Sequence, residues 1–514
     1  MMCKRCRIKG GHHNLSLGWK KAAQKRHGFI NQQGVAQIHP TIGMRDKDHA
    51  FMLTAEVMRL TSLLLCCVLA LLAQGAMASN MPVKPTLAQA LGLHIQPYRI
   101  TPAQLDHLKN LGVTWVRLPI DWPMVESPKG VYNFHRPQKW YGPTFTIHNV
   151  VSNIIQRGLK VVVVLGHGHE YHTGARQPID VPNVGREMTA PAPTTPEQQH
   201  LFAQFAAATV RHLTNSFGKE NFIWTIWNEP HSARFWFPVP DVHAYARLLS
   251  TTCRSIREID PFATIVAPGF STDTPHDYAF FKSLLNVGVD LDCLDAYSWH
   301  PYRRTWPETM ADDYQKMLGL IAQVDGPQKI LVGEMGYPVK RHTPPLAPDT
   351  GRLDDTDMQQ AALLARTAIT NHRLGIPLTI WFEWQNSGDD LNIAEHNFGL
   401  IDSAERYKPA FTVMKNLLAQ LGSATHWATV DTTCKTAITA LRTQLPDGRI
   451  KTIAWSNSRP TGVFIHLSSA QPLIDLLGKP HATNPETPFI LPLLPVVLTT
   501  EQGQPLPTLS CQKT

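Results

Sequence analysis

Two glutamates stand at the ends of apolar runs that predict buried strands. Residues 222–226 form the first run, and Glu229 comes shortly after it. Residues 329–333 form the second run, and Glu334 follows it directly. An unpaired buried carboxylate costs several kcal/mol, so neither position favours stability. Two carboxylates delivered by two strand ends are what acid/base cleavage of a glycosidic bond requires.

The elements that must position these glutamates alternate between strand and helix over residues 82–421. Strand patterns occur at residues 91–96, 113–119, 160–166, 222–227, 263–268, 293–299, 329–333 and 378–382. Helix patterns occur at residues 101–111, 147–157, 196–216, 242–258, 278–285, 313–324, 355–373 and 407–421. The run of four valines in the third strand is typical of a parallel sheet buried on both faces. Eight strand–helix pairs predict an α/β fold, a (β/α)8 TIM barrel.

The pattern changes after residue 421. Short strand patterns occur at residues 427–430, 437–444, 450–456, 462–467 and 496–500, and turn residues such as Pro446-Asp447-Gly448 separate them. Helix patterns of useful length are missing from this part of the sequence. We therefore expect residues 422–514 to form a small antiparallel β-module that resembles a β-sandwich.

Active sites of (β/α)8 barrels lie at the carboxyl ends of the strands. In this chain the candidate substrate-binding residues at those ends are Arg117, His167, Asn228, His300, Tyr302 and Trp381. Aromatic faces stack on sugar rings, and Asn, Arg and His side chains form hydrogen bonds with hydroxyl groups. A structural alternative exists for each assignment, either an ion pair or ordinary packing in the barrel.

The strand-end motifs resemble those of glycoside hydrolase clan A, the retaining barrel glycosidases. The motifs that carry this resemblance are Trp227-Asn228-Glu229-Pro230, Gly333-Glu334-Met335-Gly336, Val116-Arg117-Leu118-Pro119 and His300-Pro301-Tyr302. Two segments, residues 395–400 and 408–411, resemble both the cellulase family 5 and family 39, and the sequence does not distinguish the two families.

The resemblance implies a role for each motif. Glu229 is expected to be the acid/base, Glu334 the nucleophile, and Asn228 a contact to the sugar 2-hydroxyl. The implied reaction is hydrolysis of O-glycosidic bonds in a β-linked polysaccharide or oligosaccharide by a double displacement, without a cofactor. Retention requires carboxyl groups about 5–5.5 Å apart. Glu334 must be ionised, and Arg117 and Tyr302 nearby would lower its pKa.

Two alternative functions are open. The histidines His167, His169 and His172 are spaced as in metal-dependent barrel hydrolases, where such residues bind a catalytic metal. In the amidohydrolase type, however, a His-x-His pair belongs to the first strand, whereas His167 and His169 follow the third strand. The other alternative is a carbohydrate-binding barrel without turnover, and the presence of both glutamates argues against it. We expect no metal ion in the site.

The positive charge of the chain is confined to its beginning. The formal net charge is +8, and residues 1–59 carry almost all of it. The rest of the chain is near neutral, which excludes an electrostatic case for nucleic-acid binding. Residues 58–78 predict a signal peptide, since Arg59 precedes an apolar run that ends at Ala76-Met77-Ala78. The run is shorter than the ~20 residues of a membrane span.

These features predict a secreted or periplasmic protein that does not insert into a membrane after signal cleavage and acts as a monomer on its saccharide. Residues 1–57 are interpreted as an upstream extension, either disordered or a start-site artefact. The cysteines downstream of the signal are Cys253, Cys293, Cys434 and Cys511. An even number in an exported chain permits disulfides. Cys434 and Cys511 would staple the C-terminal module, whereas Cys253 and Cys293 are either paired or free and buried.

Overall fold

The computed structural model describes residues 85–140, 142–181, 184–271, 274–340, 356–434, 437–457, 463–468 and 472–511. The predicted extension and signal peptide, residues 1–78, lie outside these residues, so both stay predictions. Within the described residues, the search for a helix long and apolar enough to cross a membrane finds none.

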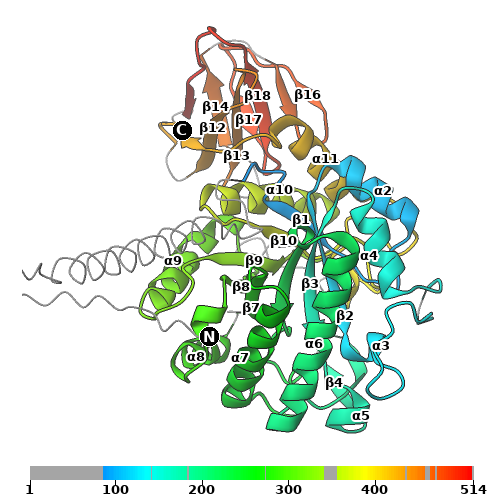
Figure 1. Ribbon diagram of the computed structural model, residues 1–514. Helices are drawn as coiled ribbons and strands as arrows, with labels where there is room; N and C mark the ends of the chain where they lie inside the picture. Colours follow the sequence, from blue (N-terminus) through cyan, green and yellow to red (C-terminus); the bar gives the residue numbers. More distant parts are fainter. Residues whose placement is uncertain are drawn as a thin grey trace, which may run out of the picture. The chain divides into compact units, whose positions relative to one another are not determined.

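Eight parallel strands close into a barrel, in the order β1-β10-β9-β8-β7-β6-β3-β2 (Figure 1). The barrel strands are β1 (Leu91–His94), β2 (Trp115–Asp121), β3 (Lys160–Gly166), β6 (Phe222–Ile226), β7 (Thr264–Ser271), β8 (Ala296–His300), β9 (Ile330–Met335) and β10 (Thr379–Trp381). Each of them overlaps one of the eight predicted strands. The structure therefore confirms the predicted (β/α)8 barrel.

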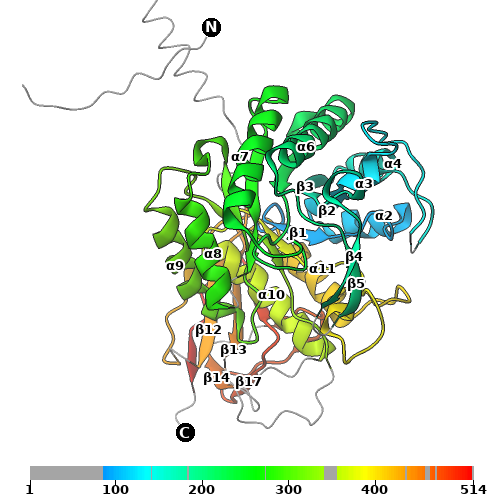
Figure 2. The ribbon, with the colours of Figure 1, turned by 90° about the horizontal axis from the view of Figure 1, so that it is seen from below.

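Helices surround the barrel as an outer layer (Figure 2). The α-helices are α2 (Pro102–Leu111), α3 (Trp122–Val125), α4 (Ile147–Ile155), α5 (Glu170–Thr173), α6 (Pro196–Phe217), α7 (Val242–Ile259), α8 (Pro275–Asn286), α9 (Met310–Ile321), α10 (Asp357–Arg373) and α11 (Pro409–Leu421). The short 3-10 helices are η1 (Lys219–Asn221), η2 (Leu291–Cys293), η3 (Pro307–Thr309) and η4 (Ala394–His396). The starts of these helices follow local rules. Thr101, for example, caps α2 by accepting a hydrogen bond from the backbone of Gln104, and Pro102 occupies the first turn.

An apolar layer fills the barrel beneath the ends of the strands. It consists of Trp115, Val162, Ile223, Val266, Ala296, Leu331, Leu378 and Ile380, all buried. A larger core lies between the strands and the surrounding helices. This layer closes the barrel below the active-site end of the strands.

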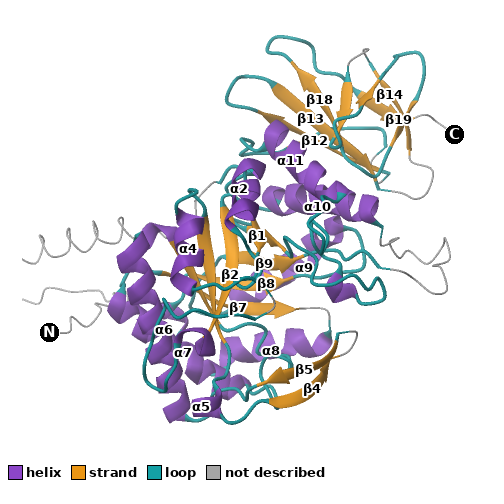
Figure 3. Ribbon diagram, turned by 90° about the vertical axis from the view of Figure 1, so that its right-hand side faces the viewer, coloured by secondary structure: helices purple, strands orange, loops and turns teal. Residues whose placement is uncertain are grey.

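A two-stranded antiparallel hairpin interrupts the connection between β3 and α6. Its strands are β4 (Gln177–Val181) and β5 (Gly185–Thr189), and they form a sheet of their own (Figure 3). The sequence predicts only a long loop here. Most of the hairpin's side chains are exposed or half-buried, so the strands carry no apolar alternation that would reveal them.

The C-terminal module consists of two antiparallel sheets. Their strands are β11 (Ala428–Thr429), β12 (Ile438–Gln444), β13 (Ile450–Ser456), β14 (Val463–Leu467), β15 (Leu473–Asp475), β16 (Pro480–His481), β17 (Phe489–Leu491), β18 (Val496–Thr500) and β19 (Leu509–Cys511). One sheet has the order β11-β12-β13-β18-β15-β16, and the other has the order β17-β14-β19. An apolar cluster joins the two sheets. The predicted β-module is confirmed, although β15, β16, β17 and β19 are too short to stand out in the sequence.

Disulfide bonding is resolved for one of the two cysteine pairs. Cys253 in α7 is bonded to Cys293 in η2. Cys434 is also disulfide-bonded. The side chain of Cys511 lies outside the described part of the structure, so the pairing of Cys434 with Cys511 stays a prediction.

Candidate active site

The end of β6 turns sharply to present Glu229. Both Trp227 and Glu229 adopt left-handed backbone conformations, with φ of 73° and 42°. Such conformations are strained for residues other than glycine and persist only where packing enforces them. Here the packing comes from Trp236, whose ring lies 5.1 Å from that of Trp227 and 5.4 Å from that of Tyr245. Tyr245 in turn donates a hydrogen bond to the carbonyl of Ile226 at 2.8 Å.

Glu334 lies near the end of β9 and is 7% exposed. Two glycines make room for the side chains around it. A Cβ atom at Gly333 would lie 2.0 Å from the Ser298 hydroxyl, and one at Gly269 would lie 1.9 Å from the His300 ring. Larger residues at either position would push His300 out of its place beneath the two glutamates.

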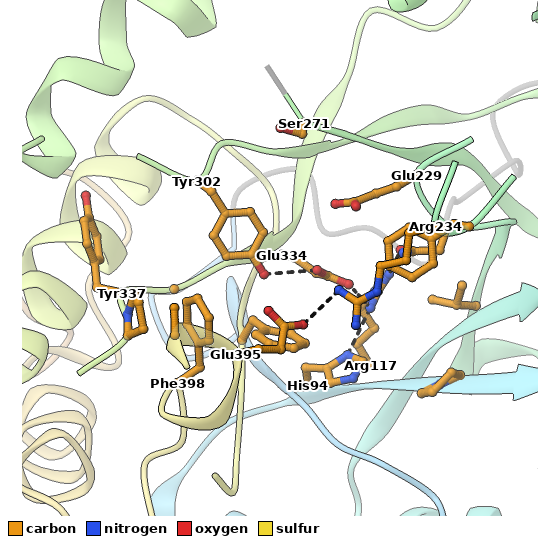
Figure 4. A pocket seen from close by; sticks show the side chains of 18 of the residues that line it. His94, Arg117, Glu229, Arg234, Ser271, Tyr302, Glu334, Tyr337, Glu395 and Phe398 are labelled. Atoms are coloured by element: carbon orange, nitrogen blue, oxygen red, sulfur yellow. Dashed lines mark hydrogen bonds and ion pairs between the residues drawn. The ribbon is translucent and has the colours of Figure 1, made fainter. Parts of the chain in front are cut away.

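The two glutamates face each other at the mouth of the barrel (Figure 4). One carboxylate oxygen of Glu229, one of Glu334 and one ring nitrogen of His300 all lie within 4.8 Å of one another. This separation is close to the about 5–5.5 Å of retaining glycosidases and shorter than the about 6.5–9.5 Å of inverting ones. The geometry on which the predicted double displacement depends is therefore present.

The contacts of Glu334 stabilise its charged form. One of its oxygens forms an ion pair with Arg117, and the other accepts a hydrogen bond from the Tyr302 hydroxyl at 3.0 Å. Burial alone would raise the pKa of Glu334, but Arg117, helped by His300 and by the hydrogen bond from Tyr302, more than offsets this effect. The pKa of Glu334 therefore lies well below its ordinary value. Burial and the nearby carboxylates raise the pKa of Tyr302, which keeps its proton available for donation.

Arg117 is itself held on two sides. Its guanidinium group donates to the Asn228 side-chain oxygen at 2.7 Å and lies 3.0 Å from His94 Nδ1. The register of the sheet places His94 directly opposite Arg117 on the neighbouring strand. Burial, together with the charge of Arg117, lowers the pKa of His94 to about 3. His94 is thus neutral and leaves the charge of Arg117 for Glu334.

Glu229 has a different environment. Its side chain is 16% exposed, compared with 10% for Glu334, and its carboxylate lies 2.7 Å from His300 Nδ1. The same nitrogen lies 3.6 Å from Glu334. No arginine or lysine forms an ion pair with Glu229 within the described part of the chain. The two carboxyl groups are therefore adjacent but unequal, one bound to a permanent cation and the other to an imidazole.

The glutamates open into a large cleft of about 1500 Å³. Of the predicted substrate-binding residues, Arg117, His167, Asn228 and Tyr302 line it, and His300 lies buried under the two carboxylates. Aromatic rings that line the cleft and were not predicted are Tyr98, Trp140, Phe235, Tyr337, Phe382 and Phe398.

Trp381 does not line the cleft. Its side chain is 1% exposed and belongs to the core, with the Tyr337 ring 6.4 Å away. The next residue, Phe382, faces the cleft instead and lies 4.9 Å from the His94 ring. This placement corrects the expectation that Trp381 faces the sugar. β10 ends at Trp381, and neighbouring side chains of an extended strand point in opposite directions, so Phe382 points into the cleft where Trp381 points into the core.

An ion-pair cluster in the cleft wall was not predicted as part of the site. Arg234, in the loop after β6, bonds to Glu187 of the β4–β5 hairpin at 2.8 Å and to Glu395 of η4 at 3.2 Å. All three residues line the cleft. They come from distant parts of the chain, and only the fold reveals that they meet.

The three histidines after β3 do not converge on one point. His167 lies 3.0 Å from Asp121, and His172 lies 2.8 Å from Glu126. His169 contacts the backbone carbonyl of Glu126 at 3.2 Å. His169 and His172 contact different atoms of Glu126, whereas His167 contacts Asp121, so the three ring nitrogens do not meet as the ligand set that a metal-dependent hydrolase would need.

Comparisons with known proteins agree with this geometry. The sequence profile of the cellulase family, glycosyl hydrolase family 5, matches residues 79–387, which include both glutamates. No curated protein sequence matches the chain.

Solved structures share the fold. A family 39 glycoside hydrolase from Bacteroides cellulosilyticus WH2 has 21% identity and a TM-score of 0.61, over 82% of this chain and 81% of its own. A monomeric beta-xylosidase from Caulobacter crescentus CB15 has 15% identity and a TM-score of 0.50, over 82% of this chain and 97% of the xylosidase. A GH39 enzyme from Xanthomonas axonopodis pv. citri has 15% identity and a TM-score of 0.51, over 82% of this chain and 96% of that enzyme. At these identities the similarity shows the fold alone, whereas the family profile covers more than half of the chain. The protein belongs to the cellulase family, glycosyl hydrolase family 5, and is a glycoside hydrolase.

Proposed function

We propose that Glu334 is the nucleophile and Glu229 the acid/base of this enzyme. The observation that carries the proposal is the pair of carboxyl groups within 4.8 Å of each other, of which only Glu334 is bound to an arginine. Arg117 keeps Glu334 ionised, as a nucleophile must be. Glu229 has no such partner among the described residues and is the group that exchanges a proton.

The reaction then proceeds in two displacements. The Glu334 carboxylate attacks the anomeric carbon while Glu229 gives its proton to the leaving glycosidic oxygen, so the glycosidic bond breaks and a glycosyl ester forms. Glu229, now a carboxylate, removes a proton from water, and the water oxygen attacks the same carbon. The ester bond breaks, and Glu334 regains its negative charge beside Arg117.

Asn228 and Phe382 are proposed to position the sugar at this centre. The side-chain oxygen of Asn228 is already bound to Arg117, so its amide N–H groups remain to donate to a sugar hydroxyl. Phe382 lies beside His94 and near Tyr302, with ring centroids 4.9 Å and 6.4 Å away. An aromatic ring in this place can stack on the apolar face of a sugar.

The substrate is proposed to be a β-linked polysaccharide or a long oligosaccharide. The cleft of about 1500 Å³ exceeds the roughly 300–1000 Å³ of sites for small ligands. Its walls carry aromatic rings and charged groups well beyond the two glutamates. With the signal-peptide pattern at residues 58–78, this supports an enzyme that acts on saccharides outside the cytoplasm.

A panel of defined polysaccharides, with analysis of the first product by proton NMR, tests the proposal. The parent enzyme is expected to release a product that keeps the anomeric configuration of the substrate. The Glu334→Gln variant should keep binding but lose hydrolysis. Inverted product, or hydrolysis at the parent rate by Glu334→Gln, would contradict the proposed roles. Secretion is tested separately, by comparing the N-terminus of the mature protein with the predicted cleavage after Ala78.

A further inference from the structure

A second cluster of chemically active side chains lies apart from the catalytic cleft, at the outer helices of the barrel. His135, His148 and His212 each bring one ring nitrogen to within 4.8 Å of the other two. His148 lies in α4, His212 lies in α6, and His135 lies in the connection between α3 and α4. The residues that line the cleft include none of the three.

The spacing of the nitrogens suits a shared metal ion. His148 Nδ1 lies 3.0 Å from His212 Nε2. Two nitrogens bound to one tetrahedral Zn²⁺ at ~2.0–2.1 Å would be about 3.3 Å apart. The His135 ring lies 4.1 Å from the His148 ring, so a small rotation of this exposed side chain would complete a three-histidine set.

The composition of the cluster selects the kind of metal. It offers three imidazole nitrogens and no carboxylate. Ca²⁺ and Mg²⁺ prefer oxygen ligands, whereas Zn²⁺ and its transition-metal neighbours bind imidazole well. Because His135 is exposed and the other two are half-buried, one side of the cluster is open to water, which can act as the fourth ligand.

Contacts that do not involve the ring nitrogens hold the three segments together. The Phe134 ring stacks on His212 at 4.1 Å with an angle of 7° between the planes. The carbonyl of the same Phe134 accepts a hydrogen bond from the His148 backbone at 3.0 Å. His135 is fixed by its backbone N–H, which donates to the Asn133 side chain at 3.0 Å. The cluster is thus preorganised.

We propose that His135, His148 and His212 bind a single Zn²⁺ ion, with water as the fourth ligand. The ion fastens the connection between α3 and α4 to the two helices. The same connection carries Trp140, whose ring lines the catalytic cleft. The metal therefore stabilises one wall of the cleft without taking part in hydrolysis.

Isothermal titration of the metal-depleted full-length protein with ZnCl2 tests this inference. The variants are His135→Ala, which changes an exposed residue, and the double variant His135→Ala/His148→Ala. The control is His200→Ala, which removes another exposed histidine from α6. Comparison with the parent corrects for zinc bound elsewhere in the chain.

The parent and His200→Ala are expected to bind one more zinc ion than the double variant, and their Tm should rise with zinc concentration. His135→Ala should weaken this binding by about tenfold or more, because even the loss of a group that only orients a metal ligand costs that much. Equal zinc binding and an equal Tm response in the parent and the double variant would overturn the proposal. If the double variant fails to fold, the same comparison with His135→Ala decides.

Discussion

The charge of Glu334 depends on a single arginine. Arg117 is 3% exposed and bonds at once to Glu334, Asn228 and His94. A lysine at this position would keep a positive charge but lose the planar group that binds several partners together.

We therefore expect Arg117→Lys to lower kcat/KM and to move the acidic limb of its pH profile toward neutral pH. In the parent enzyme, Arg117 lowers the pKa of Glu334. Because activity requires the ionised carboxylate, the parent stays active in acid solution. A weaker partner lets the pKa of Glu334 rise. The pH dependence of kcat/KM measures this shift, and Arg157→Lys, at the surface pair with Asp106, is the matched control. An unchanged acidic limb in Arg117→Lys would contradict this role of Arg117.

The ring that faces the sugar at the end of β10 gives a second prediction. Phe382→Ala should reduce kcat/KM by about tenfold to a hundredfold, since burying an aromatic face contributes roughly 1.5–3 kcal/mol. Trp381→Phe, one position away in the core, should lower Tm but change KM little. Steady-state kinetics and thermal unfolding of both variants separate the two roles. The reverse outcome would restore Trp381 as the sugar-facing ring.

At this scale the sequence predicts which charged residues meet at the mouth of the barrel, but it does not predict all of their surroundings. Glu229, Asn228 and Glu334 carry recognisable motifs at strand ends, and the structure brings them together. The sequence predicts Trp381 as the sugar-facing ring, whereas Phe382 lines the cleft, because side-chain direction at a strand end depends on a register that the sequence does not reveal.

Among the elements outside the barrel, the β4–β5 hairpin reaches the cleft through Glu187. Its Glu187 bonds to Arg234, which also bonds to Glu395. Burial opposes the charge of Glu395 and raises its pKa, although Arg234 acts in the opposite direction. Arg234 thus joins the hairpin to the loop that contains η4.

Arg234→Ala should raise KM for long substrates more than for short ones, because the hairpin then loses its contact with the cleft wall. Protease cleavage within the hairpin should also become faster. Arg176→Ala serves as the control, since Arg176 forms only a loose, exposed pair with Glu170 at 3.8 Å. Equal KM changes in both variants, with equal rates of cleavage, would argue against this role of the cluster.

The eight barrel strands were predictable because each is a short apolar run set between helix patterns. The hairpin and the Arg234 cluster were not. The hairpin strands lack a buried face, and the cluster unites residues that are far apart in the sequence.

For the whole molecule, the barrel and the C-terminal module share a buried polar contact. Arg366 of α10 is fully buried and bonds to Glu308 at 2.7 Å. Trp455 of β13 donates to the same glutamate at 2.8 Å, and Arg366 also reaches the carbonyl of Ser456 at 3.4 Å. The Glu308 side chain is 27% exposed, so removing Arg366 leaves a partly buried carboxylate uncompensated.

Arg366→Ala should therefore destabilise the protein by about 3 kcal/mol and lower the cooperativity of unfolding. The control Arg373→Ala removes an exposed contact from the same helix to Thr429 and should cost less than about 1 kcal/mol. Urea unfolding followed by tryptophan fluorescence measures both variants. An equal loss of unfolding free energy in the two variants would show that Arg366 does not couple the module to the barrel.

Covalent trapping of the enzyme tests the central assignment most directly. A 2-fluoro glycoside of the sugar identified by the polysaccharide panel, with a good leaving group, should inactivate the enzyme over time. Mass spectrometry should then find one added glycosyl group, located on the peptide that contains Glu334. A label on another residue, or hydrolysis of the glycoside without any covalent species and with inversion, would contradict the account.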